Sequence, residues 1–578
     1  MHSLLSTMLA LAAAARYASA AAISTGSSCH DLWEVAPKLL SDLEVYIAQD
    51  YPAGTNLTTK WATIAYPQPV PDLPEFCRFG AFIHTSEQNK VQFEVWLPPA
   101  DVWSGRFGMA GNGGDSGGVN FPDMWGPLAR HQMAIASTDT GHHGASGNGT
   151  FALNNPESQV DFGYRAVHLT TVYSKKIIEA YYGRAAKKSY WMGCSSGGKQ
   201  GLKEAQMYPN DYDGILAGAA AQFWDRLSAQ IWRINAIINP PDGPDYLTRA
   251  DFDHVGAVVL EQCDEIDGLK DGLIASPLEC KPDLRPIACD SAGSNSSSCL
   301  SAGKIAKMNL LYNDWYGLNN SFIYFNYLPG AEALPSFAVT GTPYSLAPDY
   351  FQYRCANPSA LPAYRKTDHR CQVVNATELS NFTVTDEAEF EKIVRQAVET
   401  NPGGITADNP DISDFLKHGK ILTYVGLSDT IIPPESSIWY RNLVYQAMGY
   451  PEDFDDYYRL FTVPGMGHCQ NGPGAWHFGG AGERPLSLKG RQLPLKDDTE
   501  HDIVAALIEW VENGKAPEKI IGVKYTDDDK TEGVDFTRPH CVWPKQAIYK
   551  GKGDPNEASS FFCGHLGGSV IKPGVPGI

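Results

Sequence analysis

The pentapeptide Gly193-Cys194-Ser195-Ser196-Gly197 contains the residues of this chain that are best suited to nucleophilic chemistry. It follows an apolar run typical of a strand and precedes a stretch typical of a helix. A G-x-S-x-G sequence in that context predicts a tight turn that presents a serine to a reacting carbonyl. Ser195 is the predicted nucleophile, because centring the motif on Ser196 would require glycine at the position of Cys194. The helix that follows would direct its positive N-terminal end at the reacting centre.

A serine hydroxyl needs a base and an orienting carboxylate before it attacks at neutral pH. His468 follows an apolar run in a glycine-rich loop, and Asp429 follows another such run. The chain order Ser195, Asp429, His468 is that of the α/β-hydrolase triad. For His468 alone, a loop histidine without a catalytic role is the alternative. The three residues together predict catalysis by a serine triad.

A triad of this kind also needs two backbone amides that face the oxygen on which negative charge develops. The amide of Ser196 is one candidate. The run Gly111-Asn112-Gly113-Gly114 offers the other, from Gly113 or Gly114, because glycine lets the backbone approach an acyl group closely. The run does not complete a dinucleotide-binding G-x-G-x-x-G motif, since Ser116 occupies its last glycine position.

An acidic loop between Cys263 and Leu273 contains three aspartates and two glycines. Carboxylate and carbonyl oxygens are the ligands that calcium selects. The predicted ligands are three side chains and two backbone carbonyls: Asp264, Asp267, Asp271, Leu269 and Leu273. The loop is not an EF-hand, because Ile266 occupies its third position, and a solvated acidic turn is the alternative. Since the loop is far from the triad in sequence, the predicted calcium would be structural.

Apolar runs that end in polar or glycine-rich turns alternate with helical patterns in both halves of the chain. The predicted strands are Gln92–Leu97, Arg106–Ala110, Gln132–Ser137, Ser189–Gly193, Gly214–Ala220, Ile421–Val425 and Tyr458–Val463. The predicted helices include Val167–Tyr181, Lys199–Met207 and Asp502–Asn513. This alternation predicts a parallel α/β sheet, with each candidate catalytic residue in a loop after a strand.

The alternation stops between about Phe223 and Asp411, where six cysteines lie. We therefore predict a catalytic domain built from residues 21–222 and 411–578, interrupted by a disulfide-stapled lid at 223–410 that holds the calcium loop. The tail after Gly564 is rich in glycine and proline and is predicted to be irregular.

The N-terminus predicts export. The apolar stretch Leu4–Ala15 and the Ala18-Ser19-Ala20 cleavage site are typical of a secretory signal peptide over residues 1–20. No later apolar segment is long enough to cross a membrane, so no membrane partner is expected. Six sequons are candidate glycosylation sites in an exported chain: Asn56, Asn148, Asn295, Asn319, Asn375 and Asn381.

Twelve cysteines in an exported chain predict six disulfides. Nearest-neighbour pairing would give Cys29–Cys77, Cys263–Cys280, Cys289–Cys299, Cys355–Cys371 and Cys541–Cys563. Cys194 and Cys469 remain, directly beside the candidate nucleophile and base. A bridge between them would tie the two catalytic loops together, and a buried free thiol at Cys194 is the alternative.

The charge balance excludes one class of partner. The 46 Lys and Arg against 66 Asp and Glu give a net charge of −20, which disfavours nucleic acid. The 43% hydrophobic and 19% charged shares of the 578 residues are those of a globular protein, not a disordered chain, a collagen or a coiled coil. The sequence does not define an oligomeric state.

These motifs together resemble the tannase and feruloyl esterase family of secreted fungal and bacterial serine esterases. The family signature is matched by Cys194-Ser195, Asp429 and His468-Cys469, and the calcium loop of its lid by Asp264–Leu273. Three stretches are closer to the fungal feruloyl esterase B branch: Gly105-Arg106-Phe107, Asn154-Asn155-Pro156-Glu157 and Asp161-Phe162-Gly163-Tyr164-Arg165.

The resemblance implies an α/β-hydrolase fold and a secreted serine carboxylesterase. The substrate it implies is a small aromatic ester or a feruloylated plant cell-wall polysaccharide. A tannase that cleaves gallate esters and an esterase for a small secondary metabolite are alternatives within the class. A non-catalytic secreted protein that binds carbohydrate or polyphenol is the alternative outside it, and the complete triad disfavours it.

Overall fold

The computed structural model describes residues 26–58, 65–153, 155–238, 243–289, 299–332, 344–354, 387–483 and 493–565. Several predicted features lie outside the described residues: the signal peptide at 1–20, the Cys355–Cys371 pair, the sequons Asn295, Asn375 and Asn381, and the tail from residue 566.

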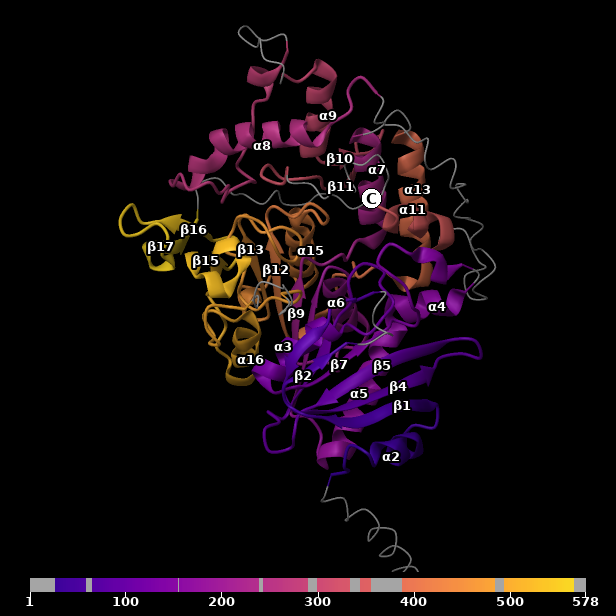
Figure 1. Cartoon of the computed structure of the whole chain (residues 1–578). Coiled ribbons are helices and arrows are strands. Elements are labelled where there is room, and N and C mark those ends of the chain that lie inside the picture. The colour runs from indigo at the N-terminus through magenta and orange to yellow at the C-terminus, as the bar shows by residue number, and fades with distance from the viewer. Residues whose placement is uncertain are drawn as a thin grey trace, which may run out of the picture.

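A nine-stranded sheet forms the centre of the molecule, with strand order β1-β4-β5-β7-β6-β8-β9-β12-β13 (Figure 1). Its strands are β1 (Leu43–Tyr51), β4 (Phe76–His84), β5 (Lys90–Leu97), β6 (Arg106–Ala110), β7 (Ala134–Thr138), β8 (Lys188–Cys194), β9 (Gly214–Gly218), β12 (Lys420–Gly426) and β13 (Tyr458–Val463). From β7 to β13 the neighbouring strands run parallel, as the alternation of strands and helices predicts.

The other end of the sheet differs from the prediction. β5, predicted within a parallel sheet, pairs antiparallel with both β4 and β7, and β1 pairs antiparallel with β4. The reason is the connection between β4 and β5, which spans only residues 85–89. A link that short closes a hairpin, whereas a parallel pair needs a crossover of roughly a dozen residues or more.

Helices cover both faces of the sheet and create two hydrophobic cores. One core contains residues of α2 (Leu32–Leu39), α5 (Ala166–Tyr182), α6 (Ser196–Met207) and α15 (Pro434–Ala447). The other contains residues of α3 (Phe121–His131) and α16 (Ile503–Asn513). The central strands supply alternating side chains to the two cores: in β8, Trp191 faces the first, and Tyr190 and Met192 face the second.

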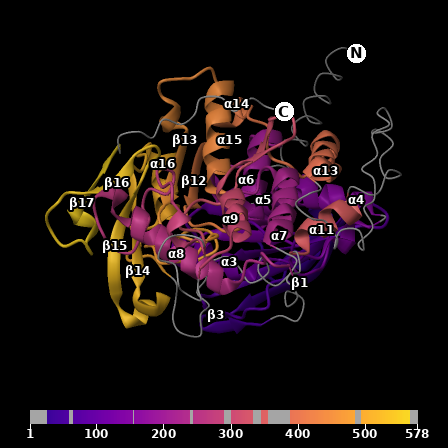
Figure 2. The same ribbon diagram turned by 90° about the horizontal axis from the view of Figure 1, so that it is seen from above.

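The chain between β9 and β12 forms a helical layer over the sheet (Figures 1 and 2). Its main elements are α7 (Trp224–Ile238), α8 (Arg249–Cys263), α9 (Ala302–Tyr312), β10 (Trp315–Tyr316), β11 (Phe322–Tyr324), α11 (Leu346–Asp349) and α13 (Glu387–Thr400). All 15 residues of α7 are buried, which fits a helix enclosed by its neighbours. This layer occupies the region predicted to be a lid.

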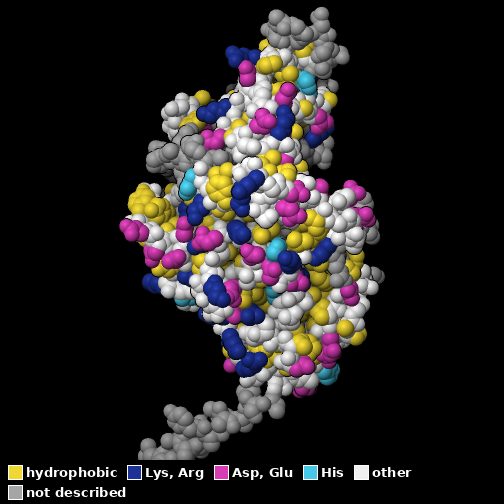
Figure 3. All heavy atoms as spheres, turned by 90° about the vertical axis from the view of Figure 1, so that its left-hand side faces the viewer, with side chains coloured by type: hydrophobic (Ala, Val, Ile, Leu, Met, Phe, Trp, Pro, Cys, Tyr) yellow, Lys and Arg dark blue, Asp and Glu magenta, His cyan; other side chains and the backbone are white. Residues whose placement is uncertain are grey.

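Two antiparallel hairpins follow α16: β14 (Lys519–Tyr525) with β15 (Val534–Cys541), and β16 (Gln546–Tyr549) with β17 (Phe561–Gly564). Arg538 of β15 pairs with Asp271 in the predicted calcium loop, so the C-terminal hairpins brace the lid. On the face shown in Figure 3, acidic and basic side chains intermingle. Among the helices that the structure describes, none combines the length and apolar character needed to cross a lipid bilayer.

Candidate functional site

Ser195 occupies the turn between β8 and α6 with a φ of 65° and a ψ of −124°. Such a backbone is strained for any residue except glycine, which is typical of a nucleophile held at a sharp strand-to-helix turn. Gly193 makes the turn possible, because a Cβ there would lie 2.5 Å from the carbonyl oxygen of Gly197. The Ser195 amide donates to the Gly218 carbonyl at 2.9 Å, which ties the turn to β9.

The predicted base and acid are hydrogen-bonded to each other. His468 Nδ1 lies 2.8 Å from Asp429 Oδ2. The Asp429 side chain is fully buried, and its Oδ1 accepts hydrogen bonds from the amides of Ile431 and Ile432 at 2.8 and 2.9 Å. β12 and β13 are parallel neighbours, so the loops that carry the acid and the base emerge at the same edge of the sheet. Ser195 and His468 line one cavity. Because the Asp429 carboxylate bonds Nδ1 of the imidazole, Nε2 is the ring nitrogen that can accept the serine proton.

A disulfide joins the nucleophile loop to the base loop. Cys194 and Cys469 are bonded, with their Cα atoms 6.0 Å apart, and Cys469 Sγ lies 3.8 Å from His468 Nε2. This bond excludes the alternative of a free thiol at Cys194. Four other predicted pairs are also present: Cys29–Cys77, Cys263–Cys280, Cys289–Cys299 and Cys541–Cys563.

Two of the three candidate oxyanion residues line the cavity that Ser195 and His468 share, and the third adjoins Ser195. Ser196 is the first residue of α6 and is fully buried, while Gly113 and Gly114 line the cavity wall. Gly114 has a φ of 53°, and a Cβ there would lie 2.0 Å from Ser146 Oγ. The Gly113 amide donates to the hydroxyl of Tyr66 at 2.9 Å. No sequence pattern pointed to Tyr66, because it lies in a loop 47 residues before Gly113.

The loop that carries these glycines is fixed to the nucleophile helix. The amide of Asn112 donates to Gln200 Oε1 of α6 at 2.9 Å. Asn112 Nδ2 donates to the carbonyls of Gly118 and Thr138 at 3.0 and 2.9 Å. A loop with this many fixed partners is preorganised, which is what a binding site for developing negative charge requires.

The cavity that Ser195 and His468 line has a volume of about 300 Å³, and one of its walls is apolar. Helix α7 contributes three residues one and two turns apart, Trp224, Leu227 and Ile231. Other apolar residues of the wall are Leu346, Ile431 and Ile432. A cavity that joins a candidate serine triad to an apolar wall can bind an ester whose acid has a hydrophobic ring.

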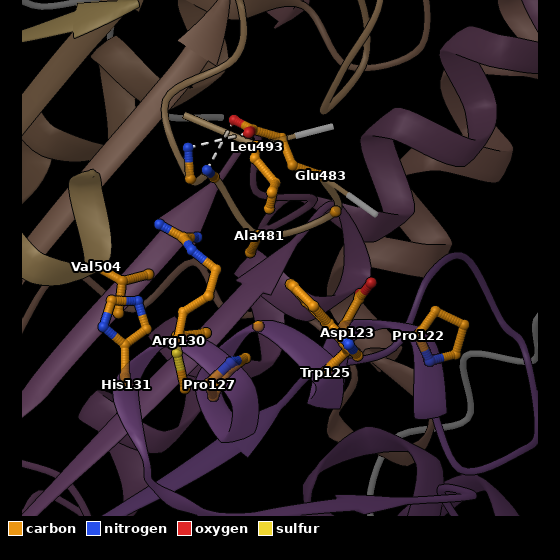
Figure 4. Close-up of a pocket in the computed structure, with 15 residues that line it drawn as sticks. Pro122, Asp123, Trp125, Pro127, Arg130, His131, Ala481, Glu483, Leu493 and Val504 are labelled. Atoms are coloured by element: carbon orange, nitrogen blue, oxygen red, sulfur yellow. Dashed lines mark hydrogen bonds between the residues drawn. The ribbon is translucent and has the colours of Figure 1, made fainter. Parts of the chain in front are cut away.

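A second, small cavity of about 50 Å³ lies beside the first, between α3 and the loop at residues 479–483 (Figure 4). Asp123 and Gly482 line both cavities. Glu483 organises the loop by accepting the amides of Phe478, Gly479 and Gly480 at 2.8–3.0 Å, and burial raises its pKa to about 7. A Cβ on Gly482 would lie 3.4 Å from Cys469 Cβ, so the loop packs against the catalytic disulfide.

The predicted calcium ligands lie in one tight loop. Asp264 accepts the amides of Asp271 and Gly272 at 3.0–3.2 Å, and Asp267 accepts that of Leu269 at 3.1 Å. Asp264 and Asp267 are buried. Burial, with the nearby charges of Asp271 and Asp264, raises the pKa of Asp267 to about 6. Carboxylates are the ligands that a divalent cation such as calcium prefers. Among the described residues, however, these three do not bring one oxygen each to within 4.8 Å of the others, and Asp271 pairs with Arg538.

The described sequons are accessible. Asn56, Asn148 and Asn319 are all exposed, as attachment of a glycan requires.

Helix α6, which begins directly after the nucleophile, carries a buried acid near its other end. The carboxylates of Glu204 and Asp211 and a ring nitrogen of His168 lie within 4.8 Å of one another. Burial and the neighbouring Asp211 raise the pKa of Glu204 well above its usual value. Glu204 therefore keeps its proton in the folded protein at a pH where it loses it in the unfolded chain.

This difference makes stability depend on pH. The contribution of Glu204 is fully present below the usual glutamate pKa and is lost as pH rises toward the raised folded value. Glu204→Gln mimics the protonated acid, so we expect the variant to melt a few degrees above the wild type at pH 8 and together with it at pH 4. Melting curves across this range test the expectation, with Glu179→Gln on the exposed face of α5 as the matched control. An equal shift at both pH values would contradict it.

Comparisons with known proteins identify relatives of this chain. The family described as "Tannase and feruloyl esterase" matches residues 77–564. A probable feruloyl esterase B-2 of Aspergillus terreus is 33% identical over 544 residues, covering 93% of this chain and 95% of the relative. A probable feruloyl esterase B-1 of Neosartorya fischeri is 33% identical over 535 residues, covering 91% and 93%.

Two solved structures superpose on this chain over almost its whole length. The crystal structure of feruloyl esterase B from Aspergillus oryzae superposes with a TM-score of 0.80 at 30% identity, covering 93% of this chain and all of the other. Tannin acyl hydrolase from Aspergillus niger superposes with a TM-score of 0.68 at 20% identity, covering 94% and 96%, which shows a shared fold.

Proposed function

Since the chain belongs to the tannase and feruloyl esterase family and is a carboxylic ester hydrolase of the α/β-hydrolase fold, we propose that it is a secreted enzyme that hydrolyses hydroxycinnamoyl esters of plant cell-wall polysaccharides. The observation that carries the proposal is the cavity in which Ser195 and the His468–Asp429 pair meet an apolar wall. Two relatives are described as probable feruloyl esterases B, which supports a hydroxycinnamoyl acyl group. Five disulfides, which persist in oxidising compartments, support export.

In the proposed mechanism Ser195 Oγ attacks the ester carbonyl while His468 Nε2 takes the hydroxyl proton. Asp429 holds Nδ1–H and stabilises the imidazolium that forms. The tetrahedral intermediate collapses when His468 gives the proton to the leaving alcohol, which leaves an acyl-serine. Water, deprotonated by His468, then attacks the acyl-serine and releases the acid.

The negative oxygen of each tetrahedral intermediate needs fixed hydrogen-bond donors. The Ser196 amide at the N-terminus of α6 supplies one, supported by the positive end of that helix. The Gly113–Gly114 segment supplies the other, and its attachment to Gln200 holds it in register with Ser195.

The apolar wall favours a cinnamoyl over a galloyl group. Trp224, Leu227 and Ile231 can pack against an aromatic ring and its vinyl linker, but their side chains carry a single polar hydrogen, the indole N–H, for three phenolic hydroxyls. Burying a hydroxyl without a hydrogen bond costs roughly 1–3 kcal/mol in proteins. Gallate esters are therefore expected to be the poorer substrates.

Initial rates on methyl ferulate, caffeate, p-coumarate, sinapate and gallate test this preference. We expect kcat/KM for the best cinnamate to exceed that for gallate by at least about tenfold, the effect of one unpaired hydroxyl. Gallate preference would place the protein among the tannases with the same mechanism. Hydrolysis of none of the five, by an enzyme that still reacts with a fluorophosphonate, would contradict the proposed acyl group.

We also propose that the loop at 264–273 holds a structural calcium ion. Asp264, Asp267 and Asp271 would supply carboxylate oxygens, and Leu269 and Leu273 would supply carbonyls. When bound, the ion would neutralise the crowded carboxylates and fix the lid against the C-terminal hairpins, where Asp271 meets Arg538. The ion has no part in the chemical steps.

Removal of calcium is expected to destabilise the enzyme. An ion present at 100 times its Kd adds about 2.7 kcal/mol, which corresponds to roughly 2 °C in Tm for a chain of this size. Melting curves with and without a chelator measure the change, with re-addition of calcium as the control. An unchanged Tm together with no calcium in elemental analysis would contradict the proposed calcium site.

A further inference from the structure

Glu483, in the wall of the second cavity, shapes the segment of the chain that precedes it (Figure 4). Its two carboxylate oxygens accept the amides of Phe478, Gly479 and Gly480 at 2.9, 3.0 and 2.8 Å. One side chain thus binds three successive backbone donors. Without it the segment 478–482 would lose most of the hydrogen bonds that define its path.

This segment meets the disulfide that joins the nucleophile loop to the base loop. Gly482, Cys194 and Cys469 line the same cavity as Ser195 and His468. A Cβ built on Gly482 would lie 3.4 Å from Cys469 Cβ and 3.9 Å from Cys194 Cβ, so the Gly482 backbone packs directly on the bond. A displacement of the segment would therefore reach both catalytic loops at their shared link.

A tyrosine of the central sheet anchors the same segment from another side. Tyr424 of β12 is buried, and its hydroxyl donates to the Ala481 carbonyl at 2.6 Å. Gly480 lies between the two anchors, because a Cβ there would lie 3.0 Å from the Tyr424 hydroxyl oxygen and 3.2 Å from Glu483 Oε1. The segment is thus held by one hydroxyl and one carboxylate.

The two anchors respond differently to pH. Three amides are best satisfied by an ionised carboxylate, because a protonated acid presents one of its oxygens as a hydroxyl donor. Burial raises the pKa of Glu483 to about 7, although the three amides and Arg130 oppose the shift. Above that pH the segment has its full set of hydrogen bonds, and below it the set is incomplete.

The surroundings of the carboxyl contain other ionisable groups. They are Asp123, Arg130 and His131 of α3, Asp502 before α16, Tyr424 of β12 and Tyr525 of β14. Burial and the charge of Glu483 raise the pKa of both tyrosines, so both stay neutral near pH 7. Arg130 is paired with Asp502 and Asp497, and His131 lies 3.3 Å from Asp502.

We propose that Glu483 is a positioning residue of the esterase: its ionised carboxylate fixes the segment 478–482 against the Cys194–Cys469 bond and thereby holds Ser195 and His468 in register. Gly482 reaches their cavity, whereas Glu483 lines the neighbouring one, so the carboxyl acts through the segment and not on the substrate. The inference rests on the proposed triad and adds a group that sets its geometry.

Glu483→Gln keeps the size of the side chain and presents one acceptor and one donor, as the protonated acid does. At pH 8.5 the wild-type carboxyl is ionised, so the variant should have a kcat about tenfold lower, since small misplacements slow catalysis. At pH 5.5 the wild-type carboxyl is protonated, so the two kcat values should agree within about twofold. p-Nitrophenyl butyrate serves as substrate. His468 and His131 are present in both proteins, so their ionisation cancels in the ratio.

Glu332→Gln is the matched control. Glu332 is a buried glutamate of the lid whose pKa is raised by burial, and it accepts the Gly330 amide at 3.0 and 3.1 Å and the Tyr312 hydroxyl. Because these partners lie in the lid and not in a catalytic loop, its kcat should stay within about twofold of the wild type at both pH values.

Tyr424→Phe tests the carboxylate without altering it. The variant lacks the other anchor, so the segment depends on Glu483 alone. Its kcat should fall about threefold at pH 8.5 and about tenfold at pH 5.5, where the carboxylate is lost as well.

A ratio of wild-type to Glu483→Gln kcat that is equal at the two pH values would overturn the proposal, because a purely structural loss does not follow the ionisation of one carboxyl. If Glu483→Gln does not fold, an equal loss at both pH values in Tyr424→Phe overturns it instead. Failure of the triad itself would show differently, as an enzyme in which Ser195→Ala still hydrolyses p-nitrophenyl butyrate.

Discussion

Ser195→Ala is expected to lower kcat by about 10⁴–10⁶-fold, leaving only the activity that oxyanion binding and substrate positioning provide. The expectation follows from three placements: the strained backbone of Ser195, the 2.8 Å contact between His468 and Asp429, and the cavity that joins them. Hydrolysis of p-nitrophenyl butyrate measures the rate, and loss of fluorophosphonate labelling identifies the nucleophile.

Ser196→Ala is the informative control, since the two serines are adjacent. The Ser196 hydroxyl is buried and hydrogen-bonds to no described group, and the substitution keeps the amide that faces the oxyanion. It should lower kcat by less than about tenfold, whereas loss of a nucleophile would cost orders of magnitude. Labelling that persists in Ser195→Ala and disappears in Ser196→Ala would reverse the assignment.

Removal of the catalytic disulfide is expected to have the second-largest effect. The Cys194–Cys469 bond spans 275 residues, and closing a loop of that length is worth roughly 5–6 kcal/mol in the chain-entropy model. In a chain of 578 residues this corresponds to a fall in Tm of roughly 4–5 °C. Cys194→Ala with Cys469→Ala should also lower kcat by about 10²-fold, because the bond fixes Ser195 relative to His468 and small misplacements slow catalysis.

Another disulfide separates the two effects. Cys289–Cys299 spans 10 residues in the lid, and its loss should cost about 3 kcal/mol of stability with kcat unchanged. Melting curves and kcat of both double variants, measured well below their Tm, test the comparison. A catalytic-disulfide variant with wild-type kcat would show that the bond stabilises the fold without aligning the triad.

The catalytic residues could be predicted because their signals are local. Ser195, Asp429 and His468 each lie within a few residues of the strand that positions them, and Cys194 and Cys469 adjoin two of them. The parallel part of the sheet could be predicted for the same reason, since strand and helix alternate there. β1 and β4 could not, because no helix separates β4 from β5 and β4 is buried almost throughout instead of alternating.

The other residues of the cavity come together through contacts between segments far apart in the sequence, and a local sequence pattern does not reveal such contacts. Tyr66 meets Gly113 only when the sheet has formed, and Trp224, Leu227 and Ile231 form a wall only when α7 is covered on its other sides. A helix buried on every face has no polar stripe from which its neighbours could be inferred. Substrate preference is therefore harder to predict from the sequence than the reaction itself.

The helical layer that carries α7 begins after Gln222 and ends before Ala407, whose amide donates to the Gln222 carbonyl at 2.9 Å. Both attachment points are therefore side by side on a rigid frame. The entropy of closing such an excursion grows only by about 0.6 kcal/mol for each doubling of its length. One contiguous piece of the gene can thus be lengthened, shortened or exchanged between relatives without moving Ser195, Asp429 or His468, provided that Arg538 keeps a partner such as Asp271. The residues that carry out the reaction can therefore stay the same while the residues that select the substrate change.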